Sequence, residues 1–138
     1  VVENRENRGF CGANNQGFAA ARGRYLVLLN NDAEAGRNWL GELVREAEAH
    51  PAAGMVGAKI YVYGTERTFD KAGHLLYWDG QNRGRGAGEE DRGQYDAPAE
   101  ILWPDGCAAL YRREMIEATG GFDEDFFAYA DDAELGMR

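Results

Sequence analysis

Short apolar runs and segments with helical spacing alternate along the first half of the chain. Residues 25–29 are apolar throughout, which is typical of a strand covered on both faces of a sheet. In residues 36–50 apolar side chains recur at helical spacing and Pro51 follows, so a helix is predicted there. Residues 12–22 predict a shorter helix that ends at Gly23, and residues 55–62 predict another strand.

This order of elements predicts the α/β class, with a mostly parallel sheet flanked by helices. Toward the C-terminus, residues 101–103 predict a further strand and Pro104, Asp105 and Gly106 predict a turn. Residues 108–111 form a short apolar run. Residues 112–119 predict a helix that ends in two glycines. The elements together are enough for one domain with its own core.

Residues 64–100 have no such pattern and predict a long glycine-rich loop. A loop of this length in a compact domain is usually functional or mobile. Arg83 and Arg85 stand among its glycines, where guanidinium groups can approach a phosphate. A flexible, solvated loop explains the same composition.

An acidic side chain follows the apolar run at residues 25–29, in the sequence Asn30, Asn31, Asp32. Open α/β sheets bind ligands beyond the carboxyl ends of their strands, so Asp32 is positioned to hold a metal ion or a sugar. Asparagine and aspartate also form tight turns through their own side chains. A simple turn is therefore the alternative interpretation of these three residues.

A second acidic cluster lies in residues 122–135, where six carboxylates alternate with four aromatic rings. Rings and acids in one segment indicate a partly desolvated pocket, in which carboxylate pKa values shift. Acids at the start of a helix are also common and stabilising, and that is the structural alternative.

Composition narrows the possible functions. The 138 residues are 44% hydrophobic and 28% charged, as in an ordinary globular domain, and the formal net charge of −9 disfavours binding to nucleic acid. Cys11 and Cys107 are too far apart in sequence for a zinc knuckle or a redox motif, so we expect reduced thiols. No apolar stretch is long enough to span a membrane and no secretory signal is evident, so we expect a cytoplasmic protein, with peripheral association at the inner membrane surface as an extension.

Several motifs resemble those of family 2 glycosyltransferases with the GT-A fold. They are residues 7–17, residues 28–32, and residues 120–127 followed by Asp131 and Asp132. Residues 70–73 and 83–96 resemble the middle section of the rhamnosyltransferase-like branch. The resemblance implies a GT-A-like fold and an internal fragment of one catalytic domain, truncated at both ends. Its parts are a nucleotide-sugar-binding part (1–63), the loop region (64–100) and an acceptor and catalytic-base part (101–138).

The resemblance also implies a donor and metal site. Asp32 matches the acidic last position of the family's metal-binding motif, and Asn30 matches its first position, which is often acidic. Mg²⁺ or Mn²⁺ fits oxygen ligands of this kind, because a hard cation stabilises the charge that develops on a diphosphate leaving group. Asn14 and Asn15 match the donor-side loop, in which the family often has Arg in place of Asn14, so Asn15 is the stronger candidate for donor contact.

The same resemblance implies an inverting transfer with Asp132 as the general base and Asp131 as its neighbour. The base takes the proton of the acceptor hydroxyl as that oxygen attacks the anomeric carbon. Asp105 and Gly106 match a turn that borders the acceptor site, although a plain turn is equally compatible. Trp78, Trp103 and Tyr77 can stack on sugars or pack in the core. His74 has no partner at ligand spacing and is given no role.

The function predicted from these motifs is transfer of a sugar from a nucleotide-sugar donor to a glycan or lipid-linked acceptor. The alternative is a truncated, noncatalytic domain that retains weak binding of nucleotide sugars or partners. A sheet without its first strands would also expose an unpaired edge, so self-association is expected.

Overall fold

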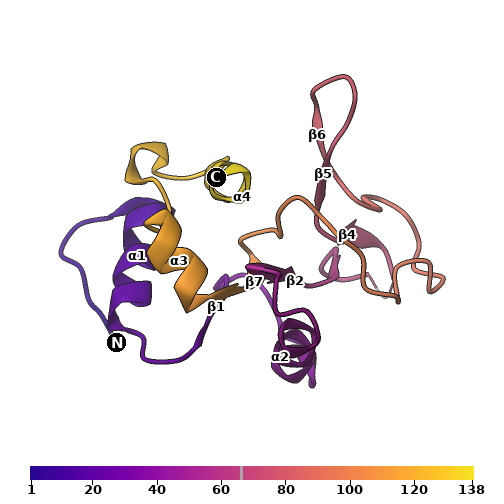
Figure 1. Ribbon diagram of the computed structural model, residues 1–138. Coiled ribbons are helices and arrows are strands. Elements are labelled where there is room, and N and C mark those ends of the chain that lie inside the picture. Colours follow the sequence, from indigo (N-terminus) through magenta and orange to yellow (C-terminus); the bar gives the residue numbers. More distant parts are fainter. Residues whose placement is uncertain (66) are drawn as a thin grey trace.

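The computed structural model describes residues 1–65 and 67–138, so Glu66, inside the segment predicted to be a loop, lies outside the described residues. Helices and strands alternate from α1 to β2, as expected for the α/β class, whereas β2 to β7 follow one another without a helix between them (Figure 1). The helices are α1 (Gly9–Ala20), α2 (Trp39–Ala49), α3 (Arg113–Thr119) and α4 (Asp131–Met137), with a 3₁₀ turn, η1 (Glu124–Phe126), before α4. The strands are β1 (Tyr25–Leu29), β2 (Met55–Gly57), β3 (Ile60–Tyr61), β4 (Phe69–Lys71), β5 (His74–Leu76), β6 (Asn82–Gly84) and β7 (Ala108–Arg112).

The main sheet has the order β1-β7-β2, and both of its strand pairs are antiparallel. The mostly parallel sheet predicted from the sequence is therefore not confirmed in the described part of the chain. β1 and β2, which α2 connects, do run in the same direction, as the strand-helix-strand pattern requires. β7 arrives from the far end of the sequence and inserts between them in the opposite direction, which separates the two parallel strands.

The central strand β7 is buried along its whole length, and its side chains supply both faces of the core. Ala109 and Tyr111 pack in a cluster with residues of α1 and α3, whereas Leu110 packs with Leu43 and Ala47 of α2. Alternate residues of a strand point to opposite faces, so one apolar strand can serve two layers of helices. The core thus explains why residues 108–111 read as a continuous hydrophobic run.

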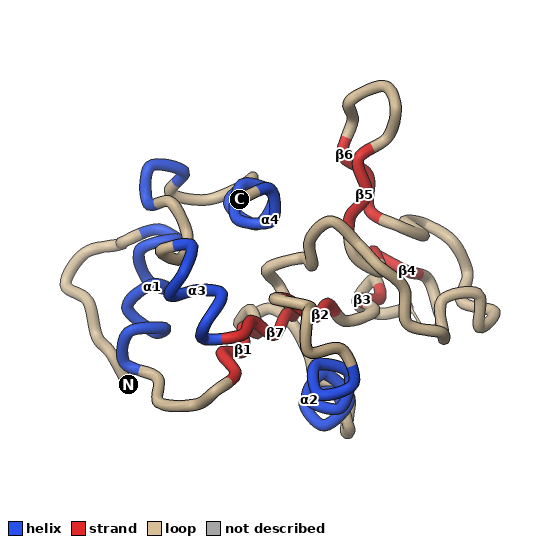
Figure 2. The backbone as a smooth tube through the Cα atoms, viewed as in Figure 1, coloured by secondary structure: helices blue, strands red, loops and turns tan. Residues whose placement is uncertain are grey.

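The segment predicted to be a long loop contains three short strands, β4, β5 and β6, and the prediction of a pure loop is wrong in that respect (Figure 2). β3 pairs with β4, and β5 pairs with β6 in a hairpin. Phe69 is fully buried, stacks with Tyr61 and makes an edge-to-face contact with Tyr95. These aromatic contacts give the segment a small core of its own, which its glycine content conceals in the sequence.

Other predicted elements differ in detail. The single strand predicted at residues 55–62 is divided into β2 and β3, which belong to different sheets. Residues 101–103 form no strand and make only an isolated bridge between Trp103 and His74. The predicted helices are present with boundaries shifted by a few residues. None of the described helices combines the length and the apolar character that a membrane crossing requires.

Arg112 at the end of β7 holds α2 against the sheet. Its guanidinium, 8% exposed, donates to the carbonyl oxygens of Ala47, His50 and Ala53, at the C-terminal end of α2 and just beyond it. The last carbonyls of a helix have no partner within the helix, and Pro51 has no N–H to offer Ala47, so Arg112 satisfies the buried Ala47 carbonyl.

We therefore predict that Arg112→Met lowers the free energy of unfolding by about 2–3 kcal/mol, because charged hydrogen bonds are lost and carbonyls are left unpaired. Urea denaturation measures this value. Arg92→Met is the matched control, since Arg92 is exposed and forms a surface ion pair with Glu90, and its effect should stay within about 0.5 kcal/mol. Equal losses in both variants would contradict the role of Arg112.

Candidate active site at the edge of the main sheet

The turn of Asp105, Gly106 and Cys107 lies immediately before β7. Asp105 Oδ1 accepts a hydrogen bond from the Cys107 N–H at 2.8 Å, which is the local turn that aspartate favours. Because β1 and β7 are antiparallel, Leu29 at the end of β1 pairs with Ala108 at the start of β7. The turn therefore stands at the edge of the sheet where β1 ends.

Asn30 and Asp32 reach this turn from β1. The Asn30 N–H donates to the Cys107 carbonyl at 2.9 Å, which extends the β1 pairing by one residue. Asp32 is exposed, and no side-chain hydrogen bond or ion pair within residues 1–65 and 67–138 involves its carboxylate. Burial raises the pKa of the Cys107 thiol, and the negative charges of Asp105 and then Asp32 raise it further. The backbone bond of Asn30 thus brings the start of the Asn30–Asp32 segment to the turn.

Asp132 reaches the same turn from α4. Its Oδ2 accepts a hydrogen bond from the Gly106 N–H at 3.4 Å, and its Oδ1 accepts one from the Ala133 N–H at 2.7 Å. A Cβ added to Gly106 would lie only 3.2 Å from the ring of Phe10, so glycine permits the close packing at this turn. Two acidic segments one hundred residues apart in sequence thus border one turn.

Asp131 differs from its neighbour. It is 6% exposed, and burial raises the pKa of its carboxyl group, with a further contribution from the charge of Asp132. Asp132 is half-buried and contacts the turn. Of the two acids named from the sequence, Asp132 is therefore the one that faces the candidate site.

A strained segment of backbone leads into these two acids. Phe127, Tyr129 and Ala130 have φ values of 54°, 70° and 61°, in the left-handed region that non-glycine residues seldom adopt. Each such residue costs on the order of 1–3 kcal/mol, and strain of this kind is concentrated at functional sites. The Phe127 carbonyl accepts the Phe10 N–H of α1 at 2.7 Å, which helps to hold the segment in place.

His74 and Lys71, to which the sequence assigned no role, also contact the turn. His74 Nε2 lies 3.3 Å from Asp105 Oδ2, and Lys71 Nζ lies 2.8 Å from the same oxygen. Burial opposes ionisation of Asp105, but the hydrogen bonds from His74, Lys71 and Cys107 outweigh it and hold the pKa of this carboxyl well below its ordinary value. Asp105 is therefore a carboxylate at neutral pH.

The ligand atoms of His74, Asp105 and Asp132 all lie within 4.8 Å of one another, close enough in principle to share a metal ion. In this arrangement the Lys71 ammonium already contacts the Asp105 oxygen that faces His74. A metal ion on this oxygen would have to displace the Lys71 ammonium or be repelled by it. The cluster is better explained as a satisfied polar network, and the unpartnered Asp32 carboxylate suits a metal ion better.

The predicted donor residues lie along α1 and β1. A shallow cavity of about 330 Å³ between these elements is lined by Asn14 and Asn30 together with all of β1. The Asn14 side chain donates to the Phe10 carbonyl one helical turn earlier. β1 is the edge strand of the sheet, so its outer side is unpaired in the described part of the chain.

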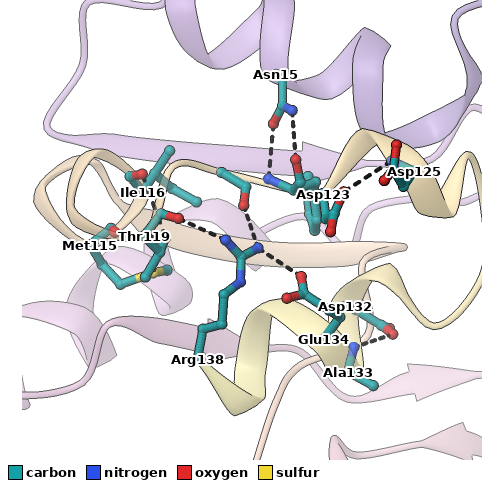
Figure 3. A network of polar contacts seen from close by, with 12 residues as sticks. Asn15, Met115, Ile116, Thr119, Asp123, Asp125, Asp132, Ala133, Glu134 and Arg138 are labelled. Atoms are coloured by element: carbon teal, nitrogen blue, oxygen red, sulfur yellow. Dashed lines mark hydrogen bonds and ion pairs between the residues drawn. The ribbon is translucent and has the colours of Figure 1, made fainter.

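The side-chain amide of Asn15 is hydrogen-bonded to the backbone of Phe122. Its Nδ2 donates to the Phe122 carbonyl at 2.8 Å, and its Oδ1 accepts the Phe122 N–H at 2.9 Å (Figure 3). Gly121, with φ 79°, permits this approach, because a Cβ there would lie 2.6 Å from Asn15 Oδ1. Asn15 therefore clamps the segment that leads to Asp132, and its predicted contact with the donor stays a prediction.

Arg138 holds the same segment from the other side. Its guanidinium donates to the carbonyls of Thr119 and Gly121 at 2.7 Å and pairs with Glu134 of α4 (Figure 3). α4, which carries Asp132, is thereby joined to the end of α3.

The other candidate residues differ in their exposure and in their partners. Trp103 is 3% exposed and packs on the ring of His74, whereas Trp78 is 96% exposed and Tyr77 is partly exposed. Arg83 pairs with Asp79, and Arg85 lies over the ring of Tyr95, so both guanidinium groups have partners.

Both cysteines are free thiols. Burial raises the pKa of Cys11 to about 11, so this buried thiol is not ionised at neutral pH.

These observations define a class of structure: a mixed α/β domain with acidic side chains gathered at one edge of its main sheet. The chain belongs to glycosyltransferase family 2, because the family model described as "Glycosyl transferase family 2" matches residues 1–120. Membership implies the GT-A fold that the motifs predicted. Asp131 and Asp132 follow the matched residues, so their roles depend on the motif and on the geometry.

Two known proteins are similar to this chain. The O-antigen biosynthesis protein RfbC of Myxococcus xanthus is 33% identical over 132 residues, which covers 91% of this chain and 10% of that protein. The uncharacterized protein y4gI of Sinorhizobium fredii (strain NBRC 101917 / NGR234) is 31% identical over 138 residues, with 91% of this chain and 14% of that protein covered. The chain thus spans about a tenth to a seventh of the length of these relatives.

We predict that Asn15→Ala lowers the free energy of unfolding by about 1–3 kcal/mol, because both backbone groups of Phe122 lose their partner. Chemical denaturation measures the change. Asn38→Ala is the control, since Asn38 is exposed and its side chain makes no capping bond to α2. If Asn15→Ala were as stable as this control, the Asn15–Phe122 hydrogen bonds would contribute nothing to the free energy of unfolding.

Proposed function

We propose that this chain forms the catalytic part of an inverting glycosyltransferase that acts in glycan synthesis. It transfers a sugar from a nucleotide-sugar donor to a hydroxyl group of a glycan or lipid-linked acceptor. Family membership and the similarity to an O-antigen biosynthesis protein support this class of reaction. The observation that carries the proposal is that the segments of Asp32 and Asp132 meet at the turn of residues 105–107.

In the proposed reaction Asp132 is the general base. Its carboxylate takes the proton of the acceptor hydroxyl, the freed oxygen attacks the anomeric carbon, and the bond to the diphosphate breaks with its electron pair. The nucleoside diphosphate leaves from the face opposite to attack, which inverts the configuration. The exposure of Asp132 relative to the buried Asp131 supports this assignment.

Asp105 and Gly106 border the proposed acceptor subsite. The ionised Asp105 carboxylate offers hydrogen-bond acceptors to a sugar hydroxyl next to the proposed base. Holding the acceptor at a fixed carboxylate lowers the entropic cost of the bimolecular step.

The donor occupies the α1 and β1 side in this proposal. Asn14 and Asn30 line the cavity there, and their amides suit hydroxyl and phosphate groups. Asn15 contributes chiefly by fixing the segment of Phe122, with any donor contact additional to that role.

Asp32 would hold Mg²⁺ or Mn²⁺, with Asn30 as a neutral oxygen donor nearby. The fit depends on the exposed Asp32 carboxylate, which no described side chain engages, and on the preference of these hard cations for oxygen ligands. When bound, such an ion supplies charge stabilisation to a departing diphosphate.

The division of the chain follows the proposed roles. Residues 1–63 serve the donor, residues 101–138 serve the acceptor and the base, and residues 64–100 support the acceptor side through Lys71 and His74.

We predict that Asp132→Asn reduces sugar transfer by at least about a hundredfold while donor binding is retained, because only the proton acceptor is removed. Transfer assays and calorimetric titration with nucleotide sugars measure the two quantities. Asp125→Asn, an identical change in the same acidic segment, should leave transfer unchanged. Normal turnover in Asp132→Asn would remove this residue from the mechanism.

A second prediction concerns the metal ion. Mn²⁺ together with the preferred nucleoside diphosphate, identified from a panel, should raise the melting temperature of the protein, since a ligand that binds only the folded state stabilises it. In Asp32→Asn the Mn²⁺-dependent part of this shift should disappear. An undiminished shift in that variant would exclude Asp32 as the metal ligand.

A further inference from the structure

His74 connects the β5–β6 hairpin to the turn of residues 105–107. Its ring is largely buried and lies nearly parallel to the indole of Trp103, at 5.7 Å between ring centroids. Nδ1 lies 2.9 Å from Asn82 Oδ1, and Nε2 lies 3.3 Å from Asp105 Oδ2. Both ring nitrogens therefore face oxygen atoms.

An imidazole with an oxygen acceptor at each nitrogen is satisfied only when both nitrogens carry a proton. The neutral ring would place an unprotonated nitrogen against either an amide oxygen or a carboxylate. The negative charge of Asp105 beside Nε2 also favours the charged ring, because opposite charges attract. The geometry therefore indicates an imidazolium.

The charges around His74 are mixed. Asp105 and Asp132 face the ring from the turn and from α4, and Lys71 at the end of β4 contacts Asp105. Asp70, next to Lys71, also pairs with that ammonium at 3.2 Å. The carboxylates outnumber the Lys71 ammonium, so the local field favours a positive ring.

We propose that His74 is a positioning residue: as an imidazolium held between Asn82 and Asp105, it fixes the Asp105 carboxylate beside Asp132 and so assembles the acceptor side of the site. Lys71 holds the same oxygen of Asp105 from β4. This inference depends on the proposed function for the role of Asp105, but the ionisation of His74 itself does not.

The pH dependence follows from the contact. Its hydrogen bond to Asp105 raises the pKa of His74 above its ordinary value of 6.5, although burial acts in the opposite direction. A group whose folded-state pKa is raised stabilises the fold fully below its unfolded-state pKa. That stabilisation is lost as the pH rises through the folded-state pKa, so Asp105 should be held less firmly above that pH.

Nuclear magnetic resonance tests the ionisation directly, because His74 and His50 are the two histidines of the chain. Long-range proton–nitrogen spectra of the protein and of His50→Gln assign the His74 ring. We expect both nitrogens to be protonated at pH 6.5, a titration midpoint above 6.5, and a lower midpoint in Asp105→Asn. A neutral ring at pH 6.5, or a midpoint that Asp105→Asn leaves unchanged, would overturn the proposal.

Kinetics with a panel of free oligosaccharide acceptors test the positioning role. In His74→Gln we expect the acceptor KM to rise about tenfold, the value for loss of one charged hydrogen bond, with a smaller change in kcat and none in donor KM. In the parent protein we expect the acceptor KM to rise as the pH passes through the folded-state pKa of His74. This rise should be absent from His74→Gln. His50→Gln should behave as the parent protein does.

A loss of kcat and donor affinity together in a folded His74→Gln would overturn the positioning role. Absence of transfer in the parent protein would count against the proposed function, and the spectra would still decide the state of His74.

Discussion

The antiparallel pairing of β1 with β7 is the constraint on which the rest of the site depends. Its register places Leu29 opposite Ala108, so the chain leaves β1 where the turn of residues 105–107 enters β7. Asn30 extends the pairing to Cys107, and Asp32 follows in the next turn. A shift of one residue would turn Tyr111 toward α2 and Leu110 toward α1 and α3, where neither side chain fits the existing packing, so the two core clusters enforce the register.

The second acidic segment is held at this edge by the core packing of Phe122 and Leu135 and by several polar contacts. Asn15 clamps Phe122, the Phe127 carbonyl accepts from α1, and Arg138 joins α4 to the end of α3. These bonds stabilise a backbone that contains three non-glycine residues with positive φ. The rigid α1 therefore serves as a support for Asp132 as well as a cover for the sheet, which explains how a short helix near the end of the chain can present a carboxylate to the turn.

The sequence predicted the helices α1, α2 and α3, the strands β1 and β2, and the acidic residues at the ends of elements, because these depend on local pattern and on turn chemistry. It showed β7 only as a short apolar run. It did not predict that β7 separates β1 from β2, since strand order is decided by packing between distant segments. His74 was missed for a related reason: its partners Asn82 and Asp105 are 8 and 31 residues away, at no recognised ligand spacing. A histidine three residues after Lys71 and just before a Leu-Leu pair was the only signal available.

The convergence of the two acidic segments is tested most directly by paramagnetic broadening of backbone amide signals during titration with Mn²⁺. Broadening should appear first at residues 31–33, at Gly106 and Cys107, and at Asp132 and Ala133, because a cation at Asp32 would lie near all three segments. Glu89 and Glu90, which follow β6 and pair with the backbone at the start of β4, provide an internal control for nonspecific binding to acids. Broadening confined to residues 31–33, with no effect at residues 106–107 or 132–133, would contradict a shared site.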